Sequence, residues 1–192
     1  MAAEDTALVQ HCLEGRPEGM RLLIERFQSD VFGLCFRLLH HRQDAEDVAQ
    51  EVFVRVFRSL HRWDGARPLK PWIMGITVNR CRTMMGKRVR RPEYVDYLHD
   101  KPARDERDDS RELQAELRLA IAQLRPDYQT VFVMFHLQNE PYDVIATAID
   151  RPVGTVKTWL HRARHEVLDC LKRRGMVPDD FVTAVKTADR KD

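Results

Sequence analysis

The residues best placed to do chemistry lie in one basic segment near the C-terminus, VGTVKTWLHRAR, at positions 153–164. Its apolar residues recur at helical spacing, and the first acid to follow is Glu166. A helix fits the DNA major groove, where basic side chains pair with guanine edges or phosphates, so we expect this helix to contact DNA. The residues predicted to do so are Thr155, Lys157, Thr158, His161, Arg162 and Arg164. The alternative is a packed helix with ordinary solvated charges, although such a face usually mixes its charge signs.

The residues before this segment complete a predicted helix-turn-helix, within PYDVIATAIDRPVGTVKTWLHRARHEV. Two helices flank a tight turn in which Asp150 tolerates a left-handed backbone. Thr155 is expected to cap the second helix, and Trp159 is expected to pack on the flank of the domain rather than on a base. The residues expected to face inward are Val144, Ile145, Ala148, Ile149, Val156, Leu160, Ala163 and Val167.

Helical periodicity extends along most of the chain and strand-type alternation is nearly absent, so the predicted fold class is all-α. Residues 42–60 carry a continuous apolar stripe, with Asp44 as the expected N-cap. A segment rich in glycine and proline then interrupts the pattern. Pro71 is expected to be the first residue of the next helix, because proline is favoured at that position.

With that stripe buried, Asp47, Gln50 and Glu51 fall together on the exposed side of the helix. An acidic and amide face of this kind suits a basic partner surface. The simpler interpretation is that acids near a helix N-terminus serve capping and the helix dipole. That interpretation explains Asp47 but leaves Gln50 and Glu51 without a role.

Composition divides the chain into two predicted helical domains, at residues 5–91 and 113–174, the second containing the helix-turn-helix. Residues 92–112 between them lack apolar periodicity and are rich in acids, which is typical of a flexible linker. Residues 175–192 form a tail to which the sequence assigns no function.

The chain as a whole carries a net charge of only +2, so the distribution of charge is more informative than its sum. It has no run of eighteen apolar residues, and acids stand where a signal peptide would be basic and apolar. We therefore expect a cytoplasmic protein without membrane insertion. Its four cysteines are isolated in sequence and are expected to be buried and reduced, and we predict neither a metal site nor a cofactor.

Nothing in the sequence indicates catalysis. It shows no Ser-His-Asp arrangement, no metal-spaced histidines and no phosphate-binding glycine loop. His40 and His41 are adjacent and so would face different sides of a helix. The chain is therefore not predicted to be an enzyme.

Taken in order, DAEDVAQEVFVRVFRSL, PWIMGITVNRCR, a linker and VGTVKTWLHRAR resemble the bacterial sigma factors of the extracytoplasmic-function (ECF) type, the smallest members of the sigma-70 family. The resemblance covers roughly residues 8–174. It implies an alternative sigma factor that directs core RNA polymerase to promoters, melts the minus-ten element and reads the minus-thirty-five element. It also implies three partners: core RNA polymerase (β′ clamp helices and β subunit), promoter DNA and an anti-sigma factor.

By this resemblance the Asp47, Gln50 and Glu51 face docks on the β′ clamp helices. The loop before PWIMGITVNR would capture an unstacked base of the nontemplate strand, where stacking and hydrogen bonds return about 1–3 kcal/mol per base. Leu69 and Ile76 would wall that pocket, and Asn79 would bond a base edge. The basic residues expected to bind phosphates beside them, whatever the sequence, are Arg80, Arg82, Lys87 and Arg88.

Two other interpretations remain open at this point. An autonomous helix-turn-helix regulator would account for the C-terminal part, but not for the exposed face at Gln50 and Glu51 or for Asn79. A protein-interaction scaffold would leave the basic helix unexplained.

Overall fold

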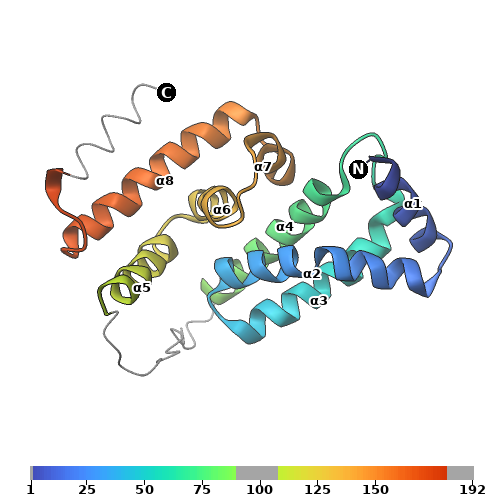
Figure 1. Cartoon of the computed structure of the whole chain (residues 1–192), viewed down its shortest axis with the longest axis horizontal. Helices are drawn as coiled ribbons and strands as arrows, with labels where there is room; N and C mark the ends of the chain where they lie inside the picture. Colours follow the sequence, from blue (N-terminus) through green and yellow to red (C-terminus); the bar gives the residue numbers. More distant parts are fainter. Residues whose placement is uncertain (1, 90–107, 181–192) are drawn as a thin grey trace.

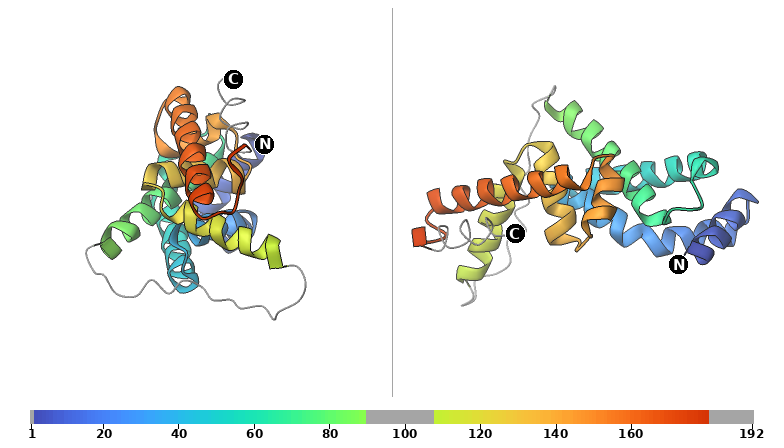
Figure 2. Two further views of the ribbon diagram at one scale, coloured as in Figure 1. Left: turned by 90° about the vertical axis from the view of Figure 1, so that its left-hand side faces the viewer. Right: turned by 90° about the horizontal axis from the view of Figure 1, so that it is seen from above.

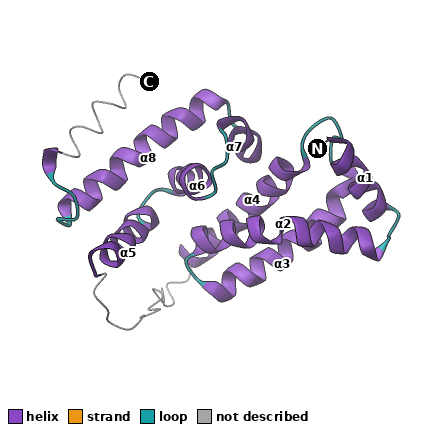
Figure 3. Ribbon diagram, viewed as in Figure 1, coloured by secondary structure: helices purple, strands orange, loops and turns teal. Residues whose placement is uncertain are grey.

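The computed structural model describes residues 2–89 and 108–180, with side chains described over 4–87 and 112–180. These residues form helices and contain no strand, which confirms the all-α prediction (Figures 1 and 3). The helices of the first half are α1 (Ala2–Leu13), α2 (Pro17–Leu39), α3 (Arg42–Ser59), the 3-10 turn η1 (Leu60–Arg62) and α4 (Leu69–Val89). Those of the second half are α5 (Asp108–Ala122), α6 (Pro126–Phe132), the π-helical turn η2 (Val133–Leu137), α7 (Tyr142–Ile149) and α8 (Val153–Arg173).

Helices α2, α3 and α4 pack side by side and form the centre of the N-terminal half (Figure 1). The apolar stripe predicted for α3 is buried, with Val52 and Val56 fully inaccessible. The cap of α3 differs from the prediction, because His41 is the N-cap and its Nδ1 accepts the backbone N–H of Asp44 at 3.2 Å. His40 just before it takes a left-handed conformation, φ 53°, which ends α2 and turns the chain.

Helix α4 begins at Leu69, two residues earlier than predicted from Pro71. Its first N–H donates to Oδ2 of Asp5 at 3.0 Å, so a carboxylate from α1 acts as the cap of α4. Asp5 is buried, and its other oxygen pairs with Arg26 of α2 at 2.8 Å. The start of α4 is therefore fixed by residues more than forty positions away, which no local pattern could indicate.

The C-terminal half contains the predicted helix-turn-helix. Asp150 ends α7 in a left-handed conformation, φ 53°, as predicted for this turn. The expected inward residues of α8, such as Leu160 and Ala163, are buried. Thr155 is not the cap of α8, since the helix begins at Val153 after Pro152. Helix α5 begins at Asp108, inside the segment predicted as a linker, and residues 92–107 of that segment lie outside the described residues.

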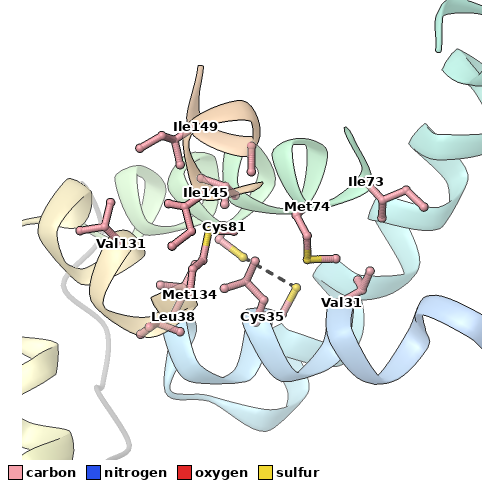
Figure 4. Packing of buried hydrophobic residues seen from close by; sticks show 14 of the residues in the cluster. Val31, Cys35, Leu38, Ile73, Met74, Cys81, Val131, Met134, Ile145 and Ile149 are labelled. Atoms are coloured by element: carbon pink, nitrogen blue, oxygen red, sulfur yellow. Dashed lines mark hydrogen bonds between the residues drawn. The ribbon is translucent and has the colours of Figure 1, made fainter. Parts of the chain in front are cut away.

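The two halves share one continuous apolar core. Residues of α2 and α4 gather with residues of α6, η2 and α7 in a single cluster (Figure 4). Helix α7 packs directly on α4, and a Cβ built at Gly75 of α4 would lie only 2.9 Å from the carbonyl oxygen of Ala148 in α7. The far ends of α8 and α1 lie at opposite ends of the elongated molecule (Figure 2). The sequence analysis did not predict this contact between the halves.

Candidate nucleic-acid interface

The residues of α8 that point away from the domain core form the outward face of this helix. Thr158 and Arg162 are exposed on it and His161 is partly exposed, as predicted. His165 also belongs to this face, one turn after His161, with the two imidazole rings 4.2 Å apart. The sequence analysis did not include His165 in the site, although its spacing of four from His161 was sufficient to find it.

Lys157 and Arg164 do not lie on the outward face. They stand on the flank of α8 that borders η2 and α7, where each cation is held against an aromatic ring. The ammonium of Lys157 is 5.4 Å from the ring centre of Tyr142. The guanidinium of Arg164 is 5.5 Å from that of Phe135, and its Nε bonds Nε2 of His136 at 3.1 Å. The prediction of one basic face was therefore too simple, and Thr155 is likewise only partly exposed.

The opposite flank of α8 carries Trp159, which is half-buried as predicted. Its ring lies 6.4 Å from that of Tyr128 in α6, and the guanidinium of Arg125 stacks on Tyr128 at 3.7 Å. Arg162 donates from Nη1 to the Tyr128 hydroxyl at 3.3 Å, and this hydrogen bond raises the pKa of Arg162. The tryptophan thus packs against the start of α6.

The residues of α4 that were predicted to bind the minus-ten element differ in their exposure to solvent. Asn79 is exposed, and Ile76 is partly covered by the shared core. Leu69 is 0% exposed, so in this conformation its side chain cannot form a pocket wall for a base, and that expectation is not met. The reason is its place in the first turn of α4, turned toward the core beneath the carboxylate of Asp5.

Two of the basic residues predicted to follow on α4 are paired with acids. Arg80 forms an ion pair with Glu51 of α3, and Arg82 pairs with Asp127 of α6 at 2.7 Å. Lys87 is exposed, and the side chain of Arg88 lies outside the described residues. The Arg80 pair joins the predicted docking helix to the predicted DNA helix, and the Arg82 pair joins the two halves of the chain.

The exposed face of α3 is present as predicted, with Asp47, Gln50 and Glu51 all accessible to solvent. Val54 extends it by one turn and is 49% exposed. The sequence analysis missed Val54, because it assigned this residue to no face. The surface is therefore acidic with an apolar end.

Further polar contacts join the halves beside α4. The ammonium of Lys70 binds Glu140 at 2.7 Å and Asp30 at 3.1 Å, and Gln138 donates to the carbonyl of Asp30 at 3.0 Å. Burial lowers the pKa of Lys70, but its hydrogen bonds to Glu140 and Asp30 outweigh that effect, so the pKa is raised overall. Glu140 is only 5% exposed and depends on Lys70 for its counter-charge.

The remaining site predictions concern metals, thiols and membranes. Within the residues that the structure describes, no group of three or more histidines, cysteines or acids could hold a metal ion. All four cysteines are buried, as predicted, and Cys35 and Cys81 meet in the core with their sulfurs 3.7 Å apart. None of the described helices is both long enough and apolar enough to span a bilayer.

Comparison with known proteins agrees with this arrangement. Residues 23–91 match the family Sigma-70 region 2, and residues 114–167 match Sigma-70, region 4. The chain is 30% identical over 176 residues to the ECF RNA polymerase sigma-E factor of Haemophilus influenzae, covering 85% of this chain and 93% of that protein. It is 29% identical over 177 residues to the RNA polymerase sigma-H factor of Pseudomonas aeruginosa, covering 85% and 92%.

Two solved structures share the fold. One is CnrH in complex with the cytosolic domain of CnrY, with a TM-score of 0.66 at 18% identity, covering 87% of this chain and 96% of that one. The other is the sigma factor RpoE in complex with the anti-sigma factor NepR from Bartonella quintana, with a TM-score of 0.64 at 19% identity, covering 79% and 96%.

The fold and the two matched regions thus define a helical transcription factor of the sigma-70 type. The chain belongs to the ECF RNA polymerase sigma factors, and it is an alternative sigma factor that directs promoter-specific transcription initiation.

Proposed function

We propose that the two halves divide the work of this sigma factor. Residues 5–91 bind core RNA polymerase and recognise and melt the minus-ten element. Residues 113–174 read the minus-thirty-five element through the outward face of α8. Residues 92–112 connect the two domains, and 175–192 form a tail outside both. The observation that carries the proposal is the exposed Asp47, Gln50, Glu51 and Val54 face standing on the same domain as Asn79.

The α3 face suits a basic protein surface with an apolar centre, and we assign it to the β′ clamp helices of the polymerase. Its apolar residue supplies buried area and its acids supply charge complementarity, which favours fast and oriented association. The β subunit is the expected neighbour of the C-terminal domain. None of the interactions described above involves Asp47, Gln50 or Val54, so these residues are available to a partner.

Binding of the minus-ten strand requires α7 to leave α4. In the described conformation, which we call the closed chain, the two halves are in contact. Helix α7 covers part of α4 beside Ile76, and Asp127 forms an ion pair with Arg82. Core polymerase would hold the two domains apart and at a fixed spacing, which raises the effective concentration of the second DNA contact once the first has formed. We therefore expect tight promoter binding by the holoenzyme and weak binding by the free chain.

The experiment is a pull-down of purified core RNA polymerase by the full chain. Asp47→Arg with Gln50→Ala should abolish binding, and this pair leaves the Glu51–Arg80 contact in place. Glu25→Arg with Gln28→Ala is the control, because it also replaces an acid by arginine and a glutamine by alanine, on the exposed surface of α2, and should bind like the parent. Equal binding by the α3 variant and the parent would remove this face from the interface.

An anti-sigma factor is the regulator expected for a protein of this family, and we propose that one binds this chain. The support is the similar fold of RpoE, which was solved in complex with the anti-sigma factor NepR. A candidate inhibitor, co-purified with the full chain, must lower core binding in the same pull-down. An inhibitor that co-purifies and leaves core binding unchanged would contradict this role.

A further inference from the structure

Two arginines share one aromatic ring on the Trp159 flank of α8. The guanidinium of Arg125 lies 3.7 Å from the ring centre of Tyr128 and 5.6 Å from that of Trp159. Arg162 contacts the same tyrosine at its hydroxyl, to which its Nη1 donates at 3.3 Å. Tyr128 is buried and fixed by α6, so both cations are held in place by one rigid group.

Among the side chains that the structure describes, no carboxylate forms an ion pair with Arg125 or with Arg162. The other arginines of the interface differ in this respect, since Arg80 and Arg82 are each paired with an acid. Two like charges on a shared ring repel each other, and an anion placed between or beside them would remove that repulsion.

The position of Arg125 indicates which anion it meets. Arg125 precedes α6 and lies outside the helix-turn-helix of α7 and α8, on the flank marked by Trp159 rather than on the outward face. A helix in the major groove lies between two phosphate backbones about 12 Å apart, with the base edges beneath it. A cation on a flank of that helix therefore meets a phosphate, whereas one on the outward face meets a base.

We propose that Arg125, held on Tyr128 and Trp159, binds a phosphate of the DNA backbone at the edge of the minus-thirty-five element. The inference rests on the proposed function of α8. Trp159 serves as a platform that orients the guanidinium before DNA arrives, which reduces the ordering that binding would otherwise require. Arg162, on the same ring but exposed on the outward face, remains available to a base edge.

The test measures binding of holoenzyme, assembled from core polymerase and the full chain, to a promoter duplex selected from random sequence by the parent holoenzyme. Affinity is measured over a series of salt concentrations. One phosphate contact contributes about 0.9 to the steepness with which log affinity falls against log salt concentration. At 0.15 M salt this contact raises the affinity about fivefold relative to 1 M salt. Arg125→Ala should lose that slope and that affinity, by the same factor at every minus-thirty-five sequence.

Two further variants separate charge from position. Arg125→Lys keeps the charge but not the planar stack, so it should retain most of the slope and bind more weakly than the parent. Arg173→Ala is the matched control, because it removes an equally exposed arginine from the last turn of α8, roughly 16 Å along the helix from Arg162. It should leave both slope and affinity unchanged.

The outcomes are distinguishable. If the parent binds core and promoter but Arg125→Ala keeps its salt slope, Arg125 touches no phosphate and the inference is wrong, while the proposed function stands. A loss of affinity without a change of slope would place Arg125 on a polymerase subunit and would also overturn it. If the parent holoenzyme selects no promoter, the proposed function fails, and the inference fails with it.

Discussion

Gly75→Ala is the change that most directly tests the contact between the two halves. The added Cβ would lie 2.9 Å from the carbonyl oxygen of Ala148, which is backbone and cannot rotate away. Helix α7 would therefore have to move off α4 by several tenths of an ångström. Overpacking of this kind costs about 1–3 kcal/mol.

The same substitution also improves the helix, because alanine is favoured over glycine in a helix interior by about 0.5–1 kcal/mol. Helix α4 is formed both when α7 packs on it (closed) and when α7 has left it (open). The gain in helix propensity therefore stabilises both states equally and does not change the equilibrium between them. The balance should shift toward the open state by the full overpacking cost, which is about 5- to 150-fold. Gly86→Ala is the control, since nothing lies within 4 Å of a Cβ at Gly86 of the same helix.

The assay is amide hydrogen exchange of peptides covering α7. This helix has only eight residues and depends on packing for its stability, so its amides should exchange faster whenever it leaves α4. Exchange in Gly75→Ala should increase by roughly the factor given above, and in Gly86→Ala it should not. If α7 exchanged at the parent's rate in Gly75→Ala, the closed contact would not exist in solution and the argument would be refuted.

Three further changes test the supports of the site by denaturant unfolding. Asp5→Ala should cost about 1–3 kcal/mol because the N–H of Leu69 loses its acceptor, whereas Asp5→Asn, which keeps an oxygen, should cost less; equal losses would contradict the capping role. Lys70→Met should destabilise more than Lys70→Met with Glu140→Leu, because only the single variant leaves a buried carboxylate unpaired. Since the folded pKa of Lys70 is raised, its contribution should be complete below the unfolded value of about 10.4 and be lost as the pH rises through the folded value. Leu160→Ala should cost about 2–5 kcal/mol, as its side chain is 1% exposed in the C-terminal core, and a loss under 1 kcal/mol would show that α8 is not packed there.

Much of the fold could be predicted because the apolar spacing within a helix is local information. The stripe of α3 and the inward face of α8 follow from residues three and four apart, and the turn at Asp150 follows from its tolerance of positive φ. The caps could not be predicted in this way. The first N–H of α4 is bonded by Asp5, 64 positions away, and the imidazole of His41 replaces the carboxylate expected at Asp44.

Residue spacing could predict only part of the geometry of the candidate interface. Spacing correctly placed Arg162 on the outward face of α8, but Lys157 and Arg164 lie on its flank. Long cationic side chains pack their stems along apolar surfaces and reach aromatic rings, and here those rings belong to Tyr142 and Phe135, outside the segment. The apolar face of α7 was likewise predicted, but a hydrophobic stripe does not specify which element covers it.

The two ion pairs on α4 differ in what must happen before this helix can bind DNA phosphates as proposed. Both carboxylates keep about half of their surface in contact with water, so a phosphate that also releases counterions can displace either of them. Glu51 stands on α3 in the same half of the chain as Arg80, so Arg80 can exchange its partner without any movement of domains. Asp127 stands on α6, so freeing Arg82 at close range requires the C-terminal half to move away. Of the two arginines, we therefore expect only Arg82 to couple phosphate binding on α4 to the separation of the halves.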